Sequence, residues 1–395
     1  MSFWGRFGRQ ATALARHREI AAIGATAILV VLVGGAYAGA SSRPSAPQSS
    51  ISRVSDNHPD QPAPPPKPLN VTSVTPGHDG TDPVKVTFAG ELSPATPLPR
   101  LSPGIPGSWQ VSGATATFTP KTGYQPGTTV TVTIPAGVRG TGTNPPVVLK
   151  PVTKRFTTGS YSRLRLQQLL AQLGYLPVSY SPDSSGPIAA NDAKGQLAAA
   201  YHAPSGSFSW KGSYPSQLTS QWRPGEDNIL QSGAVRAFES DHGLTMDGQA
   251  GPEVWSYLLS AVARGASNPN GYTYALATQG GSNENLQVWH NGKQILSTPV
   301  NTGIAKAPTE DGTFPVYERL QFQHMKGTNP DGTKYNDPVW WIAYFDGGNA
   351  VHGFERASYG SYQSLGCVEL PVNTAKRLWP YLTYGTLVTV QGPVA

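Results

Sequence analysis

The chain contains a single cysteine, Cys367, so no intramolecular disulfide can hold any part of it together. Packing and hydrogen bonds must therefore stabilise every domain, and the cysteine serves either packing or reactivity. Ser364 and Gly366 precede it, and small residues leave backbone N–H groups free to form an oxyanion hole. His352 lies fifteen positions upstream, next to Gly353, with a Ser/Tyr/Gly-rich loop between. A loop of this length can fold back, so the sequence predicts a Cys–His pair with an activated sulfur nucleophile.

Two other uses of the cysteine are open at this point. A lone cysteine commonly behaves as a small buried hydrophobic residue. Zinc binding by Cys367, His352, His324 and His290 is disfavoured, because no closely spaced ligand pair such as CxxC or HxxxH is present. We therefore expect no metal and no cofactor.

Two short runs around these residues point to a known family. The segments AVHGF, which contains His352, and SLGCVEL, which contains Cys367, resemble the signature of the L,D-transpeptidase catalytic domain family, the cysteine peptidoglycan transpeptidases. The resemblance covers roughly residues 270–391. It implies a C-terminal β-sandwich catalytic domain.

The resemblance also implies a reaction and a set of roles. In this family the cysteine attacks the carbonyl that links the third residue of a peptidoglycan stem to its terminal D-alanine, and the acyl group passes to an amine of a neighbouring stem. The resemblance implies that Cys367 is the nucleophile and His352 the general base, and that the Gly353 carbonyl orients the imidazole. Backbone N–H groups of Leu365 and Gly366 would bind the oxyanion. Expected substrate-groove residues are Tyr335, Phe345, Gly347, Gly348 and Ser364.

The chain departs from the family pattern at two positions. Leu365 stands where many members have histidine, and Glu369 stands where many have asparagine or arginine. His352 is then the only histidine of the motif, and Glu369 is expected to affect which stem termini are accepted. An L,D-carboxypeptidase that transfers the same acyl group to water, or a non-catalytic wall-binding scaffold, remain alternatives. Carbapenem-type β-lactams are expected inhibitors, because the thiol should open strained acyl donors.

Composition excludes other classes of function. Charged residues make up only 13% of the chain, whereas Gly 44 and Pro 37 are numerous, which favours turn-rich β domains joined by linkers. The net charge of +6 has no basic stripe with interleaved aromatics behind it. We therefore expect no nucleic-acid partner.

The N-terminus predicts a membrane anchor. Ile20 to Ala40 contains no charged residue and, at about 1.5 Å per residue, is long enough to cross a hydrocarbon core. Arginines 6, 9, 16 and 18 precede it, so residues 1–19 are expected in the cytoplasm and the remainder outside, in the cell wall. A cleaved signal peptide ending near Ala36-Tyr37-Ala38 is the alternative. Residues 41–66 are a Pro/Ser-rich linker that acts as an extended spacer.

Two domains are predicted before the catalytic one. Residues 67–159 alternate apolar and polar positions in short Val/Thr-rich runs, which predicts an antiparallel β-sandwich, and they resemble bacterial Ig-like domains. Residues 160–265 contain helical periodicity and resemble the three-helix peptidoglycan-binding domain. An insert near residues 178–228 interrupts this resemblance. Its aromatic residues can stack on sugars, but packing is the commoner use: Tyr201, Trp210, Tyr214 and Trp222.

Within residues 270–391 the pattern is again that of β structure. Asn291-Gly292 between two apolar runs predicts a type I′ hairpin. Residues 308–338 look irregular and predict a substrate lid. Strands are expected over 339–345 and 386–390, and a short helix over 373–382, interrupted at Pro380. The predicted architecture is thus a mainly β multidomain protein with an N-terminal transmembrane helix.

Overall fold

The computed structural model describes residues 65–77, 79–183 and 186–393. The predicted cytoplasmic segment 1–19, the predicted anchor 20–40 and the predicted linker up to residue 64 lie outside the described residues. Among the described residues, no helix combines the length and apolar character that crossing a membrane requires. The described chain is mainly β, with most of its helices between residues 163 and 263.

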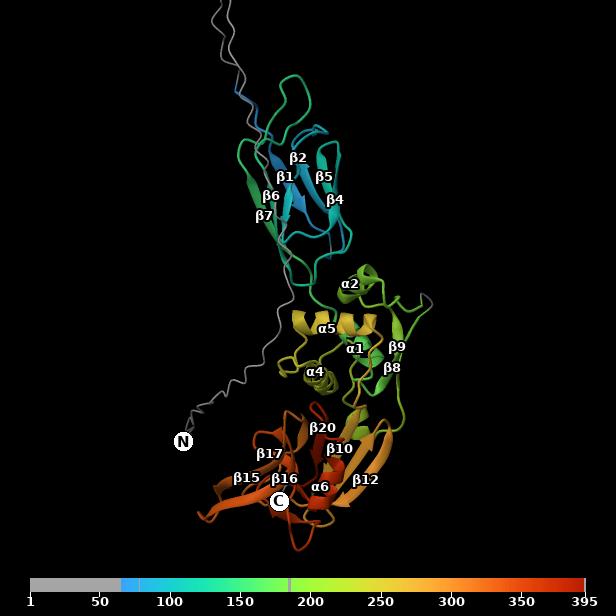
Figure 1. Ribbon diagram of the computed structural model, residues 1–395, viewed down its shortest axis with the longest axis vertical. Helices are drawn as coiled ribbons and strands as arrows, with labels where there is room; N and C mark the ends of the chain where they lie inside the picture. The colour runs from blue at the N-terminus through green and yellow to red at the C-terminus, as the bar shows by residue number, and fades with distance from the viewer. Residues whose placement is uncertain (1–64, 78, 184–185, 394–395) are drawn as a thin grey trace, which may run out of the picture. The chain divides into compact units, whose positions relative to one another are not determined.

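The first region is the predicted antiparallel sandwich (Figure 1). One sheet has the order β1-β2-β5-β4 and the other β3-β6-β7. Alternate residues face the core, as in β2, where Val84, Val86 and Phe88 are buried while Lys85 is exposed. The strands are β1 Val71–Thr75, β2 Val84–Phe88, β3 Arg100–Ser102, β4 Gly107–Ser112, β5 Thr115–Pro120, β6 Thr129–Ile134 and β7 Val152–Thr157.

Three helices follow, and each begins at a residue type that commonly starts a helix. α1 (Arg163–Gln172) is capped by the Ser162 side chain, and α4 (Ile229–His242) is capped by Asn228. α5 (Pro252–Ala263) starts with proline in its first turn. The predicted helices of this region are therefore present.

The predicted insert forms its own small elements. They are β8 (Val178–Pro182), α2 (Ala193–Tyr201), β9 (Gly206–Trp210) and α3 (Ser216–Thr219). Tyr201 is buried and donates a hydrogen bond to the Tyr124 carbonyl oxygen at 2.8 Å. Trp210, Tyr214 and Trp222 pack against a hydrophobic core. The aromatic residues of the insert are thus used in packing.

The catalytic region begins with a five-stranded sheet of order β12-β11-β10-β20-β14. Its hairpin between β11 and β12 turns at Asn291 and Gly292, whose φ values of 49° and 76° confirm the type I′ turn. Both faces of its central strands β10 and β20 are buried, whereas the edge strand β12 is largely exposed. The strands are β10 Thr273–Thr278, β11 Asn285–His290, β12 Lys293–Pro299, β14 Gly312–Pro315 and β20 Leu387–Gln391.

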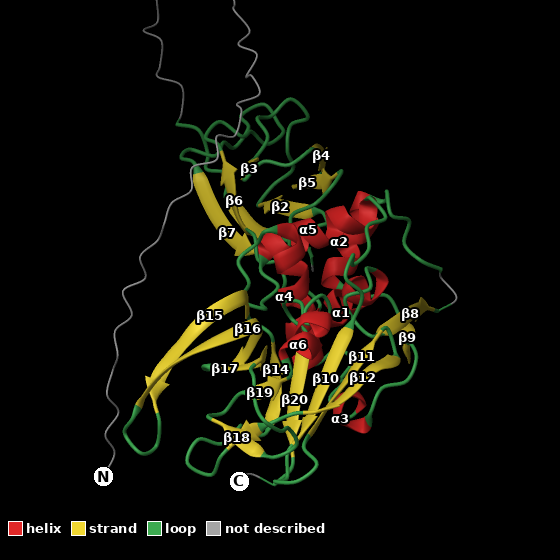
Figure 2. Ribbon diagram, turned by 60° about the horizontal axis from the view of Figure 1, so that its bottom comes forward, coloured by secondary structure: helices red, strands yellow, loops and turns green. Residues whose placement is uncertain are grey.

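A second sheet of order β15-β16-β17-β19 packs on one face of the first and closes the sandwich. β15 and β16 form a long hairpin that extends beyond the other strands (Figure 2). The pair β13-β18 forms a ladder of its own, and a backbone bridge between Asn301 and Glu369 joins its start to β19. The elements are β13 Thr302–Gly303, β15 Glu318–Thr328, β16 Lys334–Asp346, β17 Asn349–Gly353, β18 Tyr362–Ser364, β19 Val368–Leu370 and α6 Val372–Leu378.

The prediction of an irregular segment over residues 308–338 is wrong. Most of it is β14 and the β15–β16 hairpin, and residues 308–311, 316–317 and 329–333 lie outside the strands. Leu320, Val339 and Ile342 of the hairpin pack in a small hydrophobic cluster, whereas the part nearer its turn is mostly polar, with residues 334–337 lining a cavity and the other side exposed. Alternating hydrophobicity, the sequence signal for a strand, is therefore absent. The helix predicted over 373–382 with an interruption at Pro380 is present as α6, which ends at Leu378, two residues before the proline.

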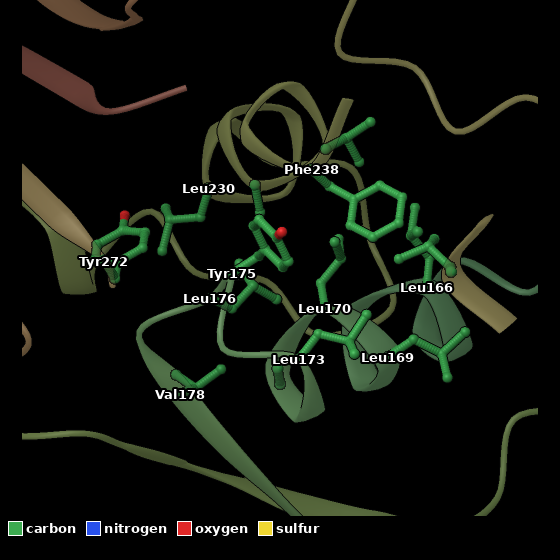
Figure 3. Close-up of a cluster of buried hydrophobic side chains, with 14 of the residues drawn as sticks. Leu166, Leu169, Leu170, Leu173, Tyr175, Leu176, Val178, Leu230, Phe238 and Tyr272 are labelled. Atoms are coloured by element: carbon green, nitrogen blue, oxygen red, sulfur yellow. The ribbon is translucent and has the colours of Figure 1, made fainter. Parts of the chain in front are cut away.

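The helical region and the catalytic sheet share one hydrophobic core. Alternate residues of β10 point to opposite faces, so Tyr274 and Leu276 join the helical core while Ala275 and Ala277 join the sandwich core. Figure 3 shows Leu170, Tyr175 and Phe238 converging between α1 and α4, with Tyr272 of the catalytic region beside Leu230. The helices are therefore part of the support of the catalytic sheet.

The contact between α4 and the turn before β20 is made by backbone. A Cβ atom added at Gly385 would lie 2.1 Å from the Gly233 carbonyl oxygen, and Gly385 also has a φ of +77°. Gly225 has a similar φ, +80°, but open space around its missing side chain. Substitution of Gly225 therefore tests backbone strain alone, whereas substitution of Gly385 tests strain together with close packing.

We expect Gly225→Ala to lower the free energy of unfolding by about 1 kcal/mol, the strain of a left-handed alanine. Gly385→Ala should lower it by roughly 1–3 kcal/mol more, because the new methyl group overlaps α4. Chemical denaturation of both variants measures the difference. Equal losses of unfolding free energy in the two variants would show that α4 can move away from the new methyl group at no cost.

Candidate active site

The site is built on two neighbouring parallel strands, β17 and β19. Their register pairs Val351 with Val368, His352 with Glu369 and Gly353 with Leu370. Paired residues of adjacent strands point to the same side of a sheet, so His352 and Glu369 share one face. Cys367 immediately precedes β19, which brings the thiol and the imidazole, fifteen residues apart in sequence, to the same edge.

His352 is held as a neutral base. Its side chain is 2% exposed, and its Nδ1 lies 3.3 Å from the Gly353 carbonyl oxygen. A carbonyl only accepts, so this contact places the proton on Nδ1 and leaves the Nε2 lone pair free. Burial lowers the pKa of His352, and the nearby Glu369 carboxylate opposes this only in part. At neutral pH the ring is therefore an unprotonated acceptor.

Cys367 is partly exposed and also neutral at rest. Burial raises the pKa of its thiol to about 12, the Glu369 charge adds to this, and a backbone hydrogen bond from Ala350 opposes it. Thiol and imidazole thus begin as an uncharged pair. Proton transfer must accompany attack on a substrate, because the free thiolate is too scarce near neutral pH.

A hydrogen-bonded turn positions the cysteine. The Ser364 hydroxyl donates to the Cys367 carbonyl oxygen at 2.6 Å and accepts the Gly366 N–H at 3.2 Å. Ser364 is completely buried, so its place is inside this turn and not on a substrate groove. The Gly366 N–H, predicted as an oxyanion donor, is engaged by Ser364 in this conformation.

The thiol and imidazole open onto one cavity of about 640 Å³. It brings together five of the predicted residues: Tyr335, Gly348, His352, Leu365 and Cys367. Gly347, Gly353, Ser364 and Gly366 are outside its lining, and Phe345 is 3% exposed and packs in the sandwich core against Phe314. The sequence did not indicate several other lining residues, among them Met325, Asp337, Phe354 and Gln363. No hydrophobic periodicity or motif in the sequence marks these residues as neighbours of the cysteine.

Glu369 is not free to meet a substrate. Its two carboxylate oxygens accept from Arg356 Nε at 2.8 Å and Arg356 Nη2 at 2.9 Å. The Glu369 side chain is 6% exposed, and that of Arg356 is 30% exposed. Such a bidentate pair is among the stronger charge-assisted contacts in proteins.

Asn301 organises the loop between His352 and Cys367, and the sequence did not single it out. Its buried Oδ1 accepts the N–H of Gly360 at 3.1 Å and the Gln363 side-chain amide at 3.2 Å. Its Nδ2 donates to the Ser358 carbonyl oxygen at 3.1 Å. One asparagine thereby satisfies several polar groups of a loop that has little regular structure.

Within the part of the chain that the structure describes, no group of three or more His, Cys, Asp or Glu side chains is arranged to hold a metal ion.

Comparison with family models matches this site to a known domain. Residues 281–390 match the L,D-transpeptidase catalytic domain, and residues 65–158 match a bacterial Ig-like domain. The chain carries an L,D-transpeptidase catalytic domain. Residues 160–265 lie outside both matched segments, so their likeness to a peptidoglycan-binding domain stays a prediction.

Solved structures were compared as well. The catalytic domain of the E. faecium L,D-transpeptidase is 29% identical, covering 30% of this chain and 96% of its own, with a TM-score of 0.28. The same domain acylated by ertapenem is 29% identical, covering 30% and 97%, with a TM-score of 0.27. An L,D-transpeptidase from Mycobacterium smegmatis is 14% identical, covering 82% and 100%, with a TM-score of 0.28. These TM-scores are too low to support an argument. No curated protein matches the chain significantly.

The Ser364 turn of this L,D-transpeptidase domain generates a prediction. Ser364→Ala should slow acylation of Cys367 by a carbapenem roughly tenfold, the equivalent of about 1.4 kcal/mol from lost hydrogen bonds. Ser358→Ala is the matched control, because Ser358 is exposed in the same loop. Stopped-flow acylation measures both variants. An unchanged rate for Ser364→Ala would mean that the turn keeps its shape without the hydroxyl.

Proposed function

We propose that this chain is an L,D-transpeptidase that cross-links peptidoglycan stem peptides through an acyl-enzyme on Cys367. The observation that carries the proposal is the placement of Cys367 and His352 on one cavity, at the edge of two paired strands, within a matched L,D-transpeptidase catalytic domain. The donor is a tetrapeptide stem, and the acceptor is an amine of a neighbouring stem.

In the first half-reaction, the Cys367 sulfur attacks the carbonyl between the third stem residue and the terminal D-alanine. His352 Nε2 takes the thiol proton as the S–C bond forms. The same proton passes to the nitrogen of the leaving D-alanine as the C–N bond breaks. This leaves a thioester on Cys367 and a neutral imidazole.

In the second half-reaction, the acceptor amine attacks the thioester carbonyl. His352 removes a proton from the amine as the new C–N bond forms, and the proton returns to the Cys367 sulfur as the C–S bond breaks. Backbone N–H groups of the Leu365–Cys367 turn would stabilise the oxyanion in both steps, once Ser364 yields the Gly366 N–H. No net oxidation or other reactant is involved.

The site residues divide by role under this proposal. Cys367 and His352 carry out the chemistry, and the Gly353 carbonyl sets the imidazole tautomer. Tyr335 and Gly348 line the cavity where the stem would bind. Carbapenems fit the same proposal as inhibitors, because their strained ring presents an acyl carbon to the thiol.

We also propose that the enzyme works outside the cell, tethered by residues 20–40. The uncharged run from Ile20 to Ala40, with arginines before it, supports this arrangement. The extended linker 41–66 and the Ig-like domain would carry the catalytic domain away from the bilayer and into the wall layer.

Analysis of muropeptides after incubation with the full-length chain tests the reaction. We expect cross-linked dimers between third residues together with free D-alanine, and neither product with Cys367→Ala. Shortened monomers without dimers would instead identify an L,D-carboxypeptidase. Unchanged muropeptides with a folded protein would favour a non-catalytic wall-binding role.

His352→Gln tests the proton acceptor. Near neutral pH, acylation by a carbapenem should slow by about 10²–10⁴-fold, the usual contribution of a positioned base. Burial lowers the pKa of His352, so the wild-type rate should fall only below about pH 6.5. Without the base, the rate should keep rising toward the thiol pKa of about 12. Coincident pH profiles would make His352 purely structural.

A further inference from the structure

Arg356 joins the two sides of the turn that carries the nucleophile. Its Nη2 donates to the Gln363 carbonyl oxygen at 3.0 Å, on the N-terminal side of Cys367. Its Nε and Nη2 also bind the carboxylate of Glu369, on the C-terminal side. One guanidinium therefore closes the arc from Gln363 to Glu369, with the thiol inside it.

The guanidinium is held in a defined plane. Its carbon atom lies 4.7 Å from the centroid of the Phe354 ring, and planar guanidinium groups stack well on aromatic faces. Tyr359 ties the same loop together, because its hydroxyl donates to the Phe354 carbonyl oxygen and accepts the Arg356 N–H. A lysine could supply the charge at this position but not the plane or the fork of donors.

The charge of Arg356 matters because of where Glu369 lies. Glu369 is nearly buried, pairs with His352 in the strand ladder and follows Cys367 by two residues. An unpaired carboxylate there would oppose loss of the thiol proton. Arg356 neutralises it at the place where the chain departs from the family pattern.

Other titratable groups face the thiol from neighbouring elements. β16 contributes Tyr335, Asp337 and Tyr344, and Lys334 lines the same cavity. Burial raises the pKa of both tyrosines, so they are neutral, and the Lys334 ammonium is exposed and bonded to Thr328. Glu369 is therefore the buried anion nearest in sequence to the thiol, with Arg356 as its bonded cation.

We propose that Arg356 is a positioning residue for Cys367, which clamps Gln363 and Glu369 around the thiol and neutralises Glu369. The inference rests on the proposed function for its catalytic meaning. The clamp and the charge are properties of the fold, however, and they are measured without any peptidoglycan substrate.

Alkylation by iodoacetamide measures the charge effect. Cys367 is the only cysteine, so intact-mass spectrometry of the full-length chain follows one site. Below the thiol pKa the alkylation rate is proportional to the thiolate fraction, and one pKa unit is a tenfold change. Arg356→Gln should slow alkylation about tenfold at pH 8, and Glu369→Gln should accelerate it about tenfold. The double variant should react near the wild-type rate.

Simple opening of the cavity cannot imitate this order of rates. Glutamine is smaller than arginine, so improved access would make Arg356→Gln faster. An Arg356→Gln rate equal to or above that of the wild type would overturn the proposal. A double variant as slow as Arg356→Gln would also overturn it, since the loss would then be independent of Glu369. Thermal unfolding confirms that each variant is folded at the assay temperature.

Arg356→Lys measures the clamp separately. It keeps the positive charge, so alkylation should stay within about threefold of the wild type, while acylation by a carbapenem falls about tenfold because the turn loosens. If a carbapenem acylates the Arg356→Lys variant at the wild-type rate, Arg356 does not act as a clamp. Absence of cross-linked muropeptides, with the alkylation order intact, would count against the proposed function and not against the role of Arg356.

Discussion

The parallel pairing of β17 with β19 is the contact on which the catalytic region depends. It joins a strand that ends in His352-Gly353 to a strand that starts directly after Cys367. The backbone ladder fixes the separation of the imidazole and the thiol without any direct bond between these side chains. Because a ladder resists sliding by single residues, the imidazole and the thiol stay on one face.

That ladder packs against a second sheet whose central strands are buried on both faces. The sandwich core covers one side of the β12-β11-β10-β20-β14 sheet, and the core shared with α1, α4 and α5 covers the other. The backbones of Gly233 in α4 and Gly385 before β20 are so close that neither position has room for a side chain. Arg319 of β15 adds a link to α6, since it donates to the Trp379 carbonyl oxygen at 2.6 Å and stacks on its ring. We therefore expect the helical region to support the site by holding the sheet behind it in place.

Burial has opposite consequences for the parts of the site. It keeps the thiol and the imidazole uncharged, which protects the sulfur from reactions that need a free thiolate. It also makes an isolated charge costly, and Glu369 is tolerated beside the pair because Arg356 satisfies both of its oxygens. A neutral resting pair and a neutralised acid together make a site in which charge develops mainly when a substrate carbonyl is attacked.

The sequence alone determined the local features of this protein. The Asn291-Gly292 turn, the capped helices and the alternating strands of the Ig-like domain all follow from short-range patterns within one element. The Cys367 and His352 motif follows from residue types and their spacing along the chain. The strand 339–345 did as well, but the rest of the β15–β16 hairpin did not, because its residues line a cavity or face solvent and show no apolar alternation. Nor did the roles of Asn301 and Ser364, or the pairing of Arg356 with Glu369. Their partners are set by which loops the folded sheet brings together, and hydrogen bonds between distant segments leave no periodic mark in the chain. Tertiary structure therefore decided how Cys367 is held, and the sequence determined that this cysteine is the proposed nucleophile.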